Sequence, residues 1–251
     1  MRPGLSTVIL FFNKPSLTNR CIAAVERAQA ACEQANFSDP RLILVDNGST
    51  PDCVAEVTKN TTALLTQLAP NQGFARGMNQ GLRAAFTDTK TDWAITLSND
   101  VELDVSFYSQ LSAGERPKEP VIFCPHVYYL MDRTKPSYTH GTLDVAQAQL
   151  SHHFEPPCDS IVFPNYYPAA ITVWSRQAFE RLGGFNERYF CYWEDVELSH
   201  RASRLGVKLT CRSDLRAYHL GRGTTGKKPS YNAHFQEGRR LTMEILAQSG
   251  Y

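Results

Sequence analysis

The first hundred residues alternate short apolar runs with stretches whose apolar residues recur at helical spacing. Residues 7–12 predict a strand, because continuously apolar sequence is typical of a strand with both faces covered. Residues 41–45, 64–68 and 93–97 predict three more strands. Three stretches between them predict helices: one that opens at Pro15 and Ser16, a short one around Val54 and Val57, and residues 73–85. Strands that alternate with helices indicate βαβ units and a mostly parallel sheet.

The second half of the chain is less regular. Its pattern predicts strands at residues 121–124, 169–174 and 217–220 and helices at 176–182, 193–205 and 233–248. Residues 126–168 are rich in Tyr, His and Pro, and we expect them to form loops or a small β excursion over the sheet. Because there is no internal repeat or linker, we expect an α/β fold with a single domain over residues 1–251.

Composition narrows the class of protein. The 26 Lys and Arg residues nearly balance the 25 Asp and Glu residues, which argues against nucleic acid as a partner. The seven cysteines never form a C-x-x-C pair, so a zinc finger is excluded and reduced thiols in the cytosol are expected. No apolar run approaches the ~20 residues of a membrane helix, and residues 1–7 are too short and polar for a signal peptide. We expect a soluble cytoplasmic protein, with peripheral association at the inner face of the membrane as the alternative.

Polar residues follow three of the predicted strands. Asn13 follows the first, Asp46 the second and Asp100 the fourth, and ligands of open α/β sheets bind at these carboxyl ends. Asp46 can accept hydrogen bonds from a pyrimidine N–H or a ribose hydroxyl. It also suits an Asx turn in the run Asp46-Asn47-Gly48-Ser49, and the residues alone do not separate the two roles.

A glycine-containing segment, residues 71–79, opens the third predicted helix. Free N–H groups at a helix start suit phosphate, and Arg76 adds positive charge. Ordinary helix capping beside a solvated arginine explains the same residues.

The densest chemical signal lies in residues 183–198. Two glycines and several aromatic residues precede Glu194 and Asp195 at the start of a helix. Acidic residues there interact favourably with the helix dipole. The aromatic residues also provide a flat wall for a sugar ring, and a carboxylate on that wall is partly desolvated, which favours a general base. Arg201 follows Glu197 by four residues, the spacing of an ion pair within a helix.

His219 ends the predicted strand at 217–220 and precedes a glycine-rich stretch. A histidine in such a place either has a structural role or completes a metal site at the base of a closing loop.

In this order, these segments resemble family 2 glycosyltransferases with the GT-A fold, in particular bacterial rhamnosyltransferases and related cell-surface polysaccharide enzymes. The matching segments are VILFFNKPSLTNRCI, LILVDNGST, NQGFARGMNQGL, TLSND, GGFNERYFCYWEDVELSHRASRLG and AYHLGRG. The resemblance spans residues 7–223 and implies a Rossmann-like sheet with a nucleotide-binding half at 1–100 and an acceptor-binding half at 101–251.

The resemblance implies a donor site with a metal. The residues that it places around the donor nucleotide and its diphosphate are Asn13, Asp46, Asn71, Gly73, Arg76, Asn79 and Asp100. Asp100 corresponds to the last acid of the D-x-D-like motif, which binds Mg²⁺ or Mn²⁺, and His219 to a second ligand. The run Ser98-Asn99-Asp100 keeps only one carboxylate of that motif, so the phosphates of the donor would complete the coordination.

The resemblance also implies the roles of the residues at the acceptor. Asp195, in the Glu194-Asp195 pair, corresponds to the catalytic base, and Tyr192 and Trp193 shape the acceptor site. Asn186 replaces an Asp that usually precedes the matching Glu.

The expected function is therefore inverting, metal-dependent transfer of a sugar from a nucleotide diphosphate to a glycan hydroxyl. TDP-rhamnose or a UDP-sugar is the expected donor. A lipid-linked glycan or another surface glycan, such as a growing lipopolysaccharide, is the expected acceptor. A catalytically degenerate module that only binds a nucleotide sugar or a glycan is one alternative. A nucleotidyltransferase is another, although Asn13-Lys14-Pro15-Ser16 replaces the basic, glycine-rich segment that such enzymes carry after the first strand.

Overall fold

The structure is a computed structural model, and it describes residues 3–32, 37–114, 117–144, 149–154, 161–162, 165–221 and 229–248. Cys158 and the part of the glycine-rich stretch from Arg222 onward lie outside these residues. The other six cysteines are free thiols.

Four parallel strands form the N-terminal part of the sheet. They are β1 (Gly4–Phe11), β2 (Ser38–Asn47), β3 (Leu64–Leu68) and β4 (Thr91–Ser98), in the order β4-β1-β2-β3. All eight residues of β1 are buried, because β2 and β4 flank the strand and helices cover both of its faces. The four predicted strands are confirmed.

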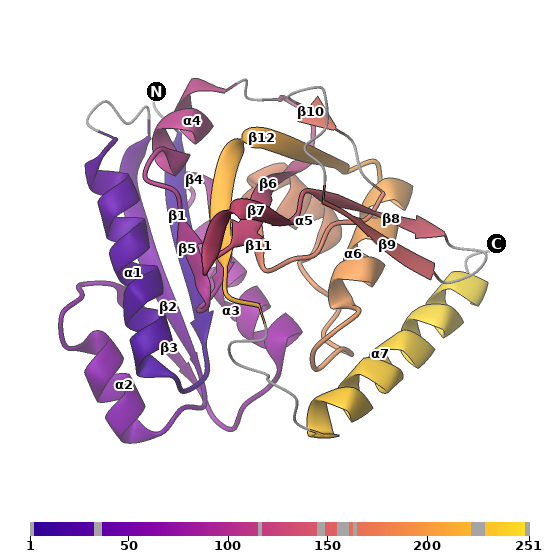
Figure 1. Cartoon of the computed structure of the whole chain (residues 1–251), viewed down its shortest axis with the longest axis horizontal. Coiled ribbons are helices and arrows are strands. Elements are labelled where there is room, and N and C mark those ends of the chain that lie inside the picture. Colours follow the sequence, from indigo (N-terminus) through magenta and orange to yellow (C-terminus); the bar gives the residue numbers. More distant parts are fainter. Residues whose placement is uncertain are drawn as a thin grey trace.

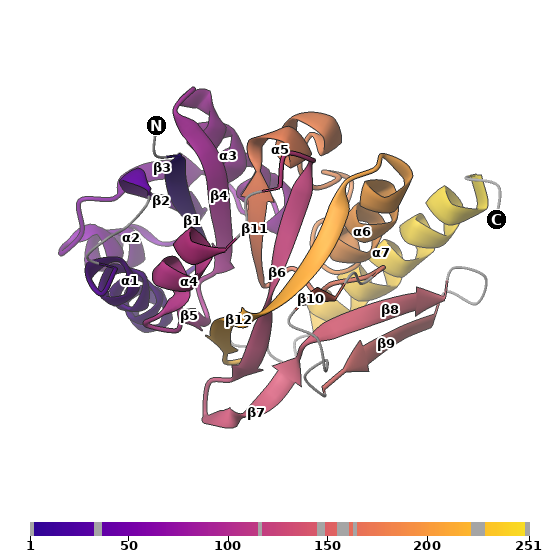
Figure 2. The same ribbon diagram turned by 90° about the horizontal axis from the view of Figure 1, so that it is seen from above.

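Helices cover both faces of these strands (Figures 1 and 2). Helices α1 (Pro15–Ala30) and α2 (Pro51–Thr58) lie on one face, and α3 (Phe74–Thr87) lies on the other against β1, β2 and β4. The apolar residues of α3 that recur at helical spacing, Met78, Leu82 and Ala85, are fully buried. Each connection between neighbouring strands therefore crosses over through a helix, as the alternating pattern predicts.

The C-terminal part of the chain extends the same sheet. Strand β11 (Ile171–Ser175) pairs antiparallel with β4 and with β6 (Val121–Tyr129), and β12 (Lys208–His219) runs parallel to β6. Two short strands, β5 (Val101–Leu103) and β10 (Ile161–Val162), pair with β12. The ten-stranded sheet confirms the predicted α/β fold with a mostly parallel sheet flanked by helices.

Three strands within residues 126–168 form the predicted β excursion, as far as the structure describes this stretch. Strand β7 (Asp132–Tyr138) pairs with β6, and β8 (His140–Asp144) and β9 (Gln149–His153) form a separate two-stranded sheet. The excursion lies along one side of the molecule, below β12 in Figure 2.

The remaining helices are α4 (Phe107–Ala113), α5 (Arg176–Leu182), α6 (Glu194–Arg204) and α7 (Pro229–Gln248). The sequence pattern did not predict α4 or β5, because both are too short to show a clear period. It also placed the starts of β12 and α7 too late. No described helix is long and apolar enough to cross a membrane.

Candidate active site

The carboxyl ends of the parallel strands meet at one edge of the sheet. Because β11 is antiparallel to both β4 and β6, strands β6 and β12 run in the same direction as β4. Asn13, Asp46 and Asp100, which follow or end β1, β2 and β4, therefore share an edge with His219 at the end of β12.

Asn13 and Asp46 connect the ends of β1 and β2. The Asp46 carboxylate is buried and accepts a hydrogen bond from the Ser49 N–H at 2.8 Å, which is the Asx turn that the sequence allows. The Asn13 N–H donates to Ser49 Oγ at 2.8 Å, and Asn13 Oδ1 accepts from the Thr50 N–H at 3.1 Å. Both residues thus shape the loops at this edge of the sheet, and direct contact with a nucleotide stays a prediction.

Asn47 positions the segment before α3, a role that the sequence analysis missed. Its Nδ2 donates to the Gly73 carbonyl at 2.9 Å, and its Oδ1 accepts from the Gln72 N–H at 3.0 Å. Asn71 Oδ1 accepts from the Gly73 N–H at 2.8 Å. Asn47 directly follows Asp46 in a sequence that strongly favours a turn, so the sequence indicates a turn residue at this position and not a contact with Gly73.

Gly73 joins this segment to the aromatic stretch that precedes α6. Its backbone has φ 87° and ψ 174°, a conformation almost restricted to glycine, and a Cβ atom there would collide with the Phe190 carbonyl oxygen. The next residue, Phe74, donates its N–H to the same oxygen at 2.5 Å. The predicted donor and acceptor segments are therefore in direct contact.

Replacing Gly73 with Ala is expected to lower the free energy of unfolding by about 2–4 kcal/mol, because backbone strain and a collision add. Gly183 is a matched control: it has φ 73°, but a Cβ atom there meets no described atom within 4 Å. The Gly183→Ala variant should lose only about 1 kcal/mol. Urea unfolding of the two variants measures the difference, and equal losses would contradict a close packing of Gly73 on Phe190.

Asn79 and Arg76, on α3, contact residues 185–187. Asn79 is buried; its Nδ2 donates to the Phe185 carbonyl at 2.8 Å and to Glu187 Oε1 at 3.0 Å, and its Oδ1 accepts from the Phe185 N–H at 2.7 Å. Arg76 Nε lies 3.9 Å from Glu187 Oε2, with the arginine side chain half exposed. Asn79 therefore holds the 183–187 segment in place, and Glu187 is a further site residue that the sequence analysis did not single out.

Asp100 and His219 come together from strands β4 and β12. Asp100 Oδ1 lies 3.3 Å from His219 Nε2, and the two side chains are 6% and 18% exposed. The pairing of β5 with β12, in which His219 lies opposite Val101, fixes this approach, and the Leu220 N–H donates to the Asp100 carbonyl at 3.0 Å. The predicted metal pair is thus brought together by strand pairing.

The chemistry of this pair fits a divalent cation. A carboxylate oxygen and an imidazole nitrogen are ligands that Mn²⁺ accepts, and Mg²⁺ commonly binds through one or two carboxylates together with substrate phosphates. Within the described residues, no group of three or more His, Cys, Asp or Glu side chains could hold a metal. Asp100 and His219 would therefore leave coordination positions for water and phosphate oxygens.

Glu194 and Asp195 begin α6 after two residues in a left-handed conformation. Tyr192 and Trp193 have φ of 71° and 70°, which is strained for residues with large side chains. Asp195 Oδ2 faces the Ala169 N–H at 3.4 Å and the Tyr166 hydroxyl at 3.5 Å. After the backbone turn at 192–193, the Asp195 carboxylate thus faces the segment that leads into the start of β11.

Burial raises the pKa of both carboxyl groups. For Glu194, which is 7% exposed, burial is the larger cause and repulsion by Asp195 adds to it; its Oε2 has no hydrogen-bond partner among the described residues. Burial raises the pKa of Asp195 as well, and the N–H groups of Ala169 and Val196 partly offset the rise. Such a pair suits proton transfer near neutral pH.

The Glu194 carboxyl predicts a pH-dependent stability. In the folded protein the pKa of Glu194 lies above its ordinary value of 4.5, so on raising the pH the unfolded chain loses this proton at a lower pH than the folded protein does. The free energy of unfolding therefore falls as the pH rises from about the unfolded pKa through the folded pKa. The slope is at most about 1.4 kcal/mol per pH unit. In the Glu194→Gln variant this part of the slope should disappear. Urea unfolding at several pH values measures it, and parallel curves for variant and wild type would contradict a raised pKa.

Helix α7 covers the outer side of the aromatic stretch. The ring centroids of Tyr192 and Trp193 lie 5.9 Å and 5.7 Å from that of Phe235, and a Cβ atom at Gly238 would collide with the Tyr192 carbonyl oxygen. Trp193 is buried, and its Nε1 has no hydrogen-bond partner among the described residues. Tyr192, the other predicted acceptor residue, is partly buried.

Glu197 has a structural role, as its spacing predicts. Its two oxygens accept from Arg201 Nε at 2.8 Å and from Arg201 Nη2 at 3.1 Å, and Arg201 also donates to the carbonyls of Leu182 and Gly184. This ion pair fastens α6 to Leu182 and Gly184, so Glu194 and Asp195 are the acids of the first turn of α6 that have no ion pair with Arg201.

Two curated proteins are similar to this chain in sequence. An N-acetylglucosaminyl-diphospho-decaprenol L-rhamnosyltransferase of Mycobacterium tuberculosis is 25% identical over 249 residues, covering 89% of this chain and 80% of the relative. The O-antigen biosynthesis protein RfbC of Myxococcus xanthus is 23% identical over 232 residues, covering 86% of this chain and 17% of that protein.

Solved structures share the fold. GalNAc-T7, crystallised with UDP, GalNAc and Mn²⁺, superposes with a TM-score of 0.73 at 16% identity, and the match covers 97% of this chain but 48% of that one. The mannosyltransferase PcManGT of Pyrobaculum calidifontis, in complex with GDP-Man and Mn²⁺, gives a TM-score of 0.62 at 14% identity, covering 100% of this chain and 66% of that one. These similarities confirm the GT-A architecture.

The family model of glycosyl transferase family 2 matches residues 6–176, which is more than half of the chain. It includes the segments that carry Asn13, Asp46, Gly73 and Asp100. The chain belongs to glycosyl transferase family 2 and is a glycosyltransferase.

Proposed function

We propose that this protein transfers a sugar from a nucleotide diphosphate to a glycan hydroxyl with inversion at the anomeric carbon. One observation carries the proposal: Gly73, in the predicted donor segment, packs directly on Phe190, in the segment that leads to Glu194 and Asp195. From this contact we infer that the Asp100–His219 pair and the Glu194–Asp195 pair serve one site. A site with a metal-ligand pair beside a desolvated carboxylate supplies the two groups that glycosyl transfer needs, one for the leaving group and one for the acceptor.

The donor would lie across the carboxyl ends of β1, β2 and β4. Asn13 and Asp46 would bind the base and ribose, and the backbone of Asn71 and Gly73 at the start of α3 would face the diphosphate. Arg76, half exposed beside Glu187, carries a positive charge that can turn toward phosphate oxygens. Residues 1–100 would then form the donor half of the protein and residues 101–251 the acceptor half.

Asp100 and His219 would hold Mg²⁺ or Mn²⁺, which when bound neutralises negative charge on the diphosphate. Asp195 would accept the proton of the acceptor hydroxyl while that oxygen forms a bond to the anomeric carbon. The bond between the anomeric carbon and the diphosphate oxygen breaks on the opposite face, which inverts the configuration. Glu194, buried next to Asp195, would raise the basicity of its neighbour when ionised.

The relatives suggest a substrate class. The name of the mycobacterial relative specifies rhamnose transfer onto a lipid-linked N-acetylglucosamine, and the name of the myxobacterial relative specifies O-antigen synthesis. By analogy we propose TDP-rhamnose as the donor, with a UDP-sugar as the second candidate. The acceptor would be a lipid-linked glycan in the synthesis of a surface polysaccharide such as lipopolysaccharide.

The proposal is tested by thermal unfolding with UDP, TDP and GDP, each with and without Mn²⁺. A nucleotide at 100 times its dissociation constant stabilises the folded state by about 2.7 kcal/mol. We expect a Mn²⁺-dependent stabilisation that is largest for TDP. No stabilisation of folded protein by any nucleotide would contradict the donor site. A nucleotide sugar that binds but is neither transferred nor hydrolysed would instead favour a degenerate binding module.

A further inference from the structure

The turn between β6 and β7 presents apolar side chains at the active-site edge. Met131 is 81% exposed and Tyr129 is 37% exposed, and in Figure 2 the turn projects from the body of the molecule. The N–H of Leu130 between them donates to the His219 carbonyl at 2.9 Å. An exposed apolar tip is thereby fixed to the end of the strand that carries His219.

Basic side chains follow this tip along β7. Lys135 Nζ lies 5.6 Å from the centre of the Tyr129 ring, and the Arg133 guanidinium lies 4.3 Å from the centre of the Tyr218 ring. Both side chains are exposed, so their charges face solvent beside the apolar tip.

Glu102 holds the basic residues of β7 and α1 together. Its two oxygens lie 2.8 Å from Arg20 Nη2 and 2.6 Å from Arg133 Nη2, although the arginine side chains remain 53% and 52% exposed. Because the buried Glu102 side chain anchors both guanidinium groups, they lie on one surface without burying their outer N–H groups.

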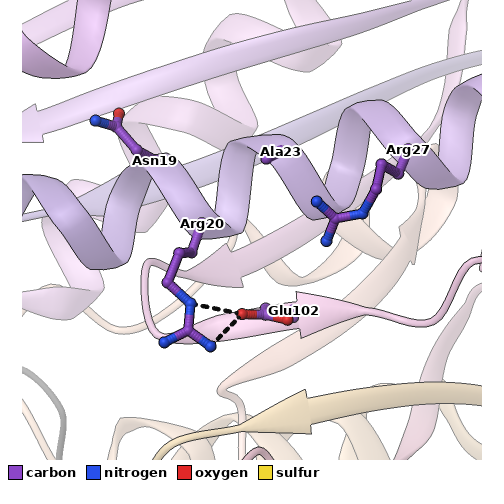
Figure 3. Close-up of a pocket in the computed structure, with 5 residues that line it drawn as sticks. All are labelled: Asn19, Arg20, Ala23, Arg27 and Glu102. Atoms are coloured by element: carbon purple, nitrogen blue, oxygen red, sulfur yellow. Dashed lines mark hydrogen bonds and ion pairs between the residues drawn. The ribbon is translucent and has the colours of Figure 1, made fainter.

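A shallow groove continues this surface along α1. It has a volume of about 430 Å³ and is lined by Asn19, Arg20, Ala23, Arg27 and Glu102. Figure 3 shows Arg20 bonded to Glu102 and Arg27 two turns further along the same side of the helix. The groove is open and polar, and it offers N–H donors to an anion.

The surface concentrates positive charge in a chain whose net charge is +1. Its basic residues are Arg20, Arg27, Arg133, Lys135 and Arg216, the last of which lies over the Tyr128 ring. The neighbouring acids are Glu102, Asp104 and Asp132, and each accepts hydrogen bonds from a nearby side chain: Arg20 and Arg133, Tyr218, and Thr134, respectively. Five basic side chains thus lie beside three hydrogen-bonded carboxylates, and the Arg20 and Arg133 side chains stay about half exposed.

We propose that this surface, formed by the β6–β7 turn, the basic residues of β7 and β12 and the groove along α1, docks on an anionic lipid bilayer. Met131 and Tyr129 enter the interface between headgroups and acyl chains, while the arginine and lysine side chains contact lipid phosphates. Because the turn is bonded to His219, docking places the active-site edge against the membrane. Docking would bring a lipid-linked acceptor to the active site, and this consequence rests on the proposed function. The docking itself does not.

Co-sedimentation with lipid vesicles tests the proposal, using phosphatidylcholine alone or mixed with phosphatidylglycerol. The wild-type protein should bind only the anionic vesicles and should be released by high salt, which screens the charges. Lys135→Glu should weaken binding by roughly tenfold or more, since each positive charge near such a surface contributes a factor of about five. Met131→Asp should also weaken binding, and because the Met131 side chain is exposed, its replacement removes no core packing.

Lys118→Glu is the matched control, because Lys118 is exposed just before β6, at the end of that strand opposite the turn. It makes the same change in net charge and should retain the binding of the wild type. Four outcomes would each overturn the proposal. The first two are equal losses in Lys118→Glu and Lys135→Glu, and binding that neither Lys135→Glu nor Met131→Asp weakens. The other two are equal binding to neutral and anionic vesicles, and no vesicle binding by folded wild type. Since vesicle binding needs neither donor nor acceptor, its failure is separate from any failure of nucleotide binding.

Discussion

Replacing Asp195 with Asn is expected to reduce turnover by roughly a hundredfold to ten-thousandfold, the usual contribution of a general base. The amide keeps the size of the side chain and can still accept from the Ala169 N–H, but it cannot take the acceptor proton. Stabilisation by nucleotide and Mn²⁺ should stay at the wild-type level, because Asp100 and His219 are unchanged. Initial rates at saturating donor, combined with thermal unfolding, measure both quantities.

Glu194→Gln is the comparison that assigns the base. Glu194 is the other carboxyl with a pKa raised by burial, and it directly precedes Asp195 on α6. If Asp195→Asn retains turnover while Glu194→Gln loses it, Glu194 is the base and the assignment is reversed. Glu197 does not compete for this role, because both of its oxygens bond to Arg201.

The second large effect is expected for Asp100→Ala, which should abolish the Mn²⁺-dependent part of nucleotide stabilisation, about 2.7 kcal/mol at 100 times the dissociation constant. His219 would be left as one ligand without its carboxylate partner, and the diphosphate would lose its link to the protein. Transfer activity should fall with it, because stabilisation of the leaving group is usually a large part of catalysis. Thermal unfolding with TDP or UDP, with and without Mn²⁺, gives the readout independently of activity.

Asp92→Asn provides the matched control for this variant. Asp92 lies at the start of β4, the opposite end of the strand that leads to Asp100. It is exposed, and its Oδ2 accepts from the Gly4 N–H at 3.0 Å. Its replacement should leave the Mn²⁺-dependent stabilisation intact. Retention of the full Mn²⁺ effect in Asp100→Ala would place the metal at residues other than Asp100 and His219.

Backbone strain marks both sides of the site. Asn13 and Lys14, at the end of β1, have φ of 54° and 56°, and Tyr192 and Trp193 show the same left-handed conformation before α6. Two consecutive residues of this kind are costly, and they persist only where surrounding structure holds them. Here Ser49 and Thr50 bond to Asn13 of the first pair, and Phe235 of α7 packs against the second pair.

The sequence by itself determined the parts of this protein that depend on local pattern. Nearly continuous apolar runs identified β1, β2 and β4, because a strand covered on both faces has no polar side to show. Polar residues placed directly after those runs identified Asn13, Asp46 and Asp100, because the ends of parallel strands share an edge. Glu197 and Arg201 were paired from spacing alone, because helix geometry fixes neighbours at four residues.

Only the tertiary structure decided which distant residues meet. His219 reaches Asp100 because β12 pairs with β5, and a three-residue strand carries no sequence period. Asn79 and Asn47 hold loops through contacts that no spacing encodes. Trp193, a candidate sugar platform from its neighbours in sequence, is buried because α7, which begins 36 residues later, packs on it. Such contacts depend on how whole elements pack, and local periodicity holds no information about that packing.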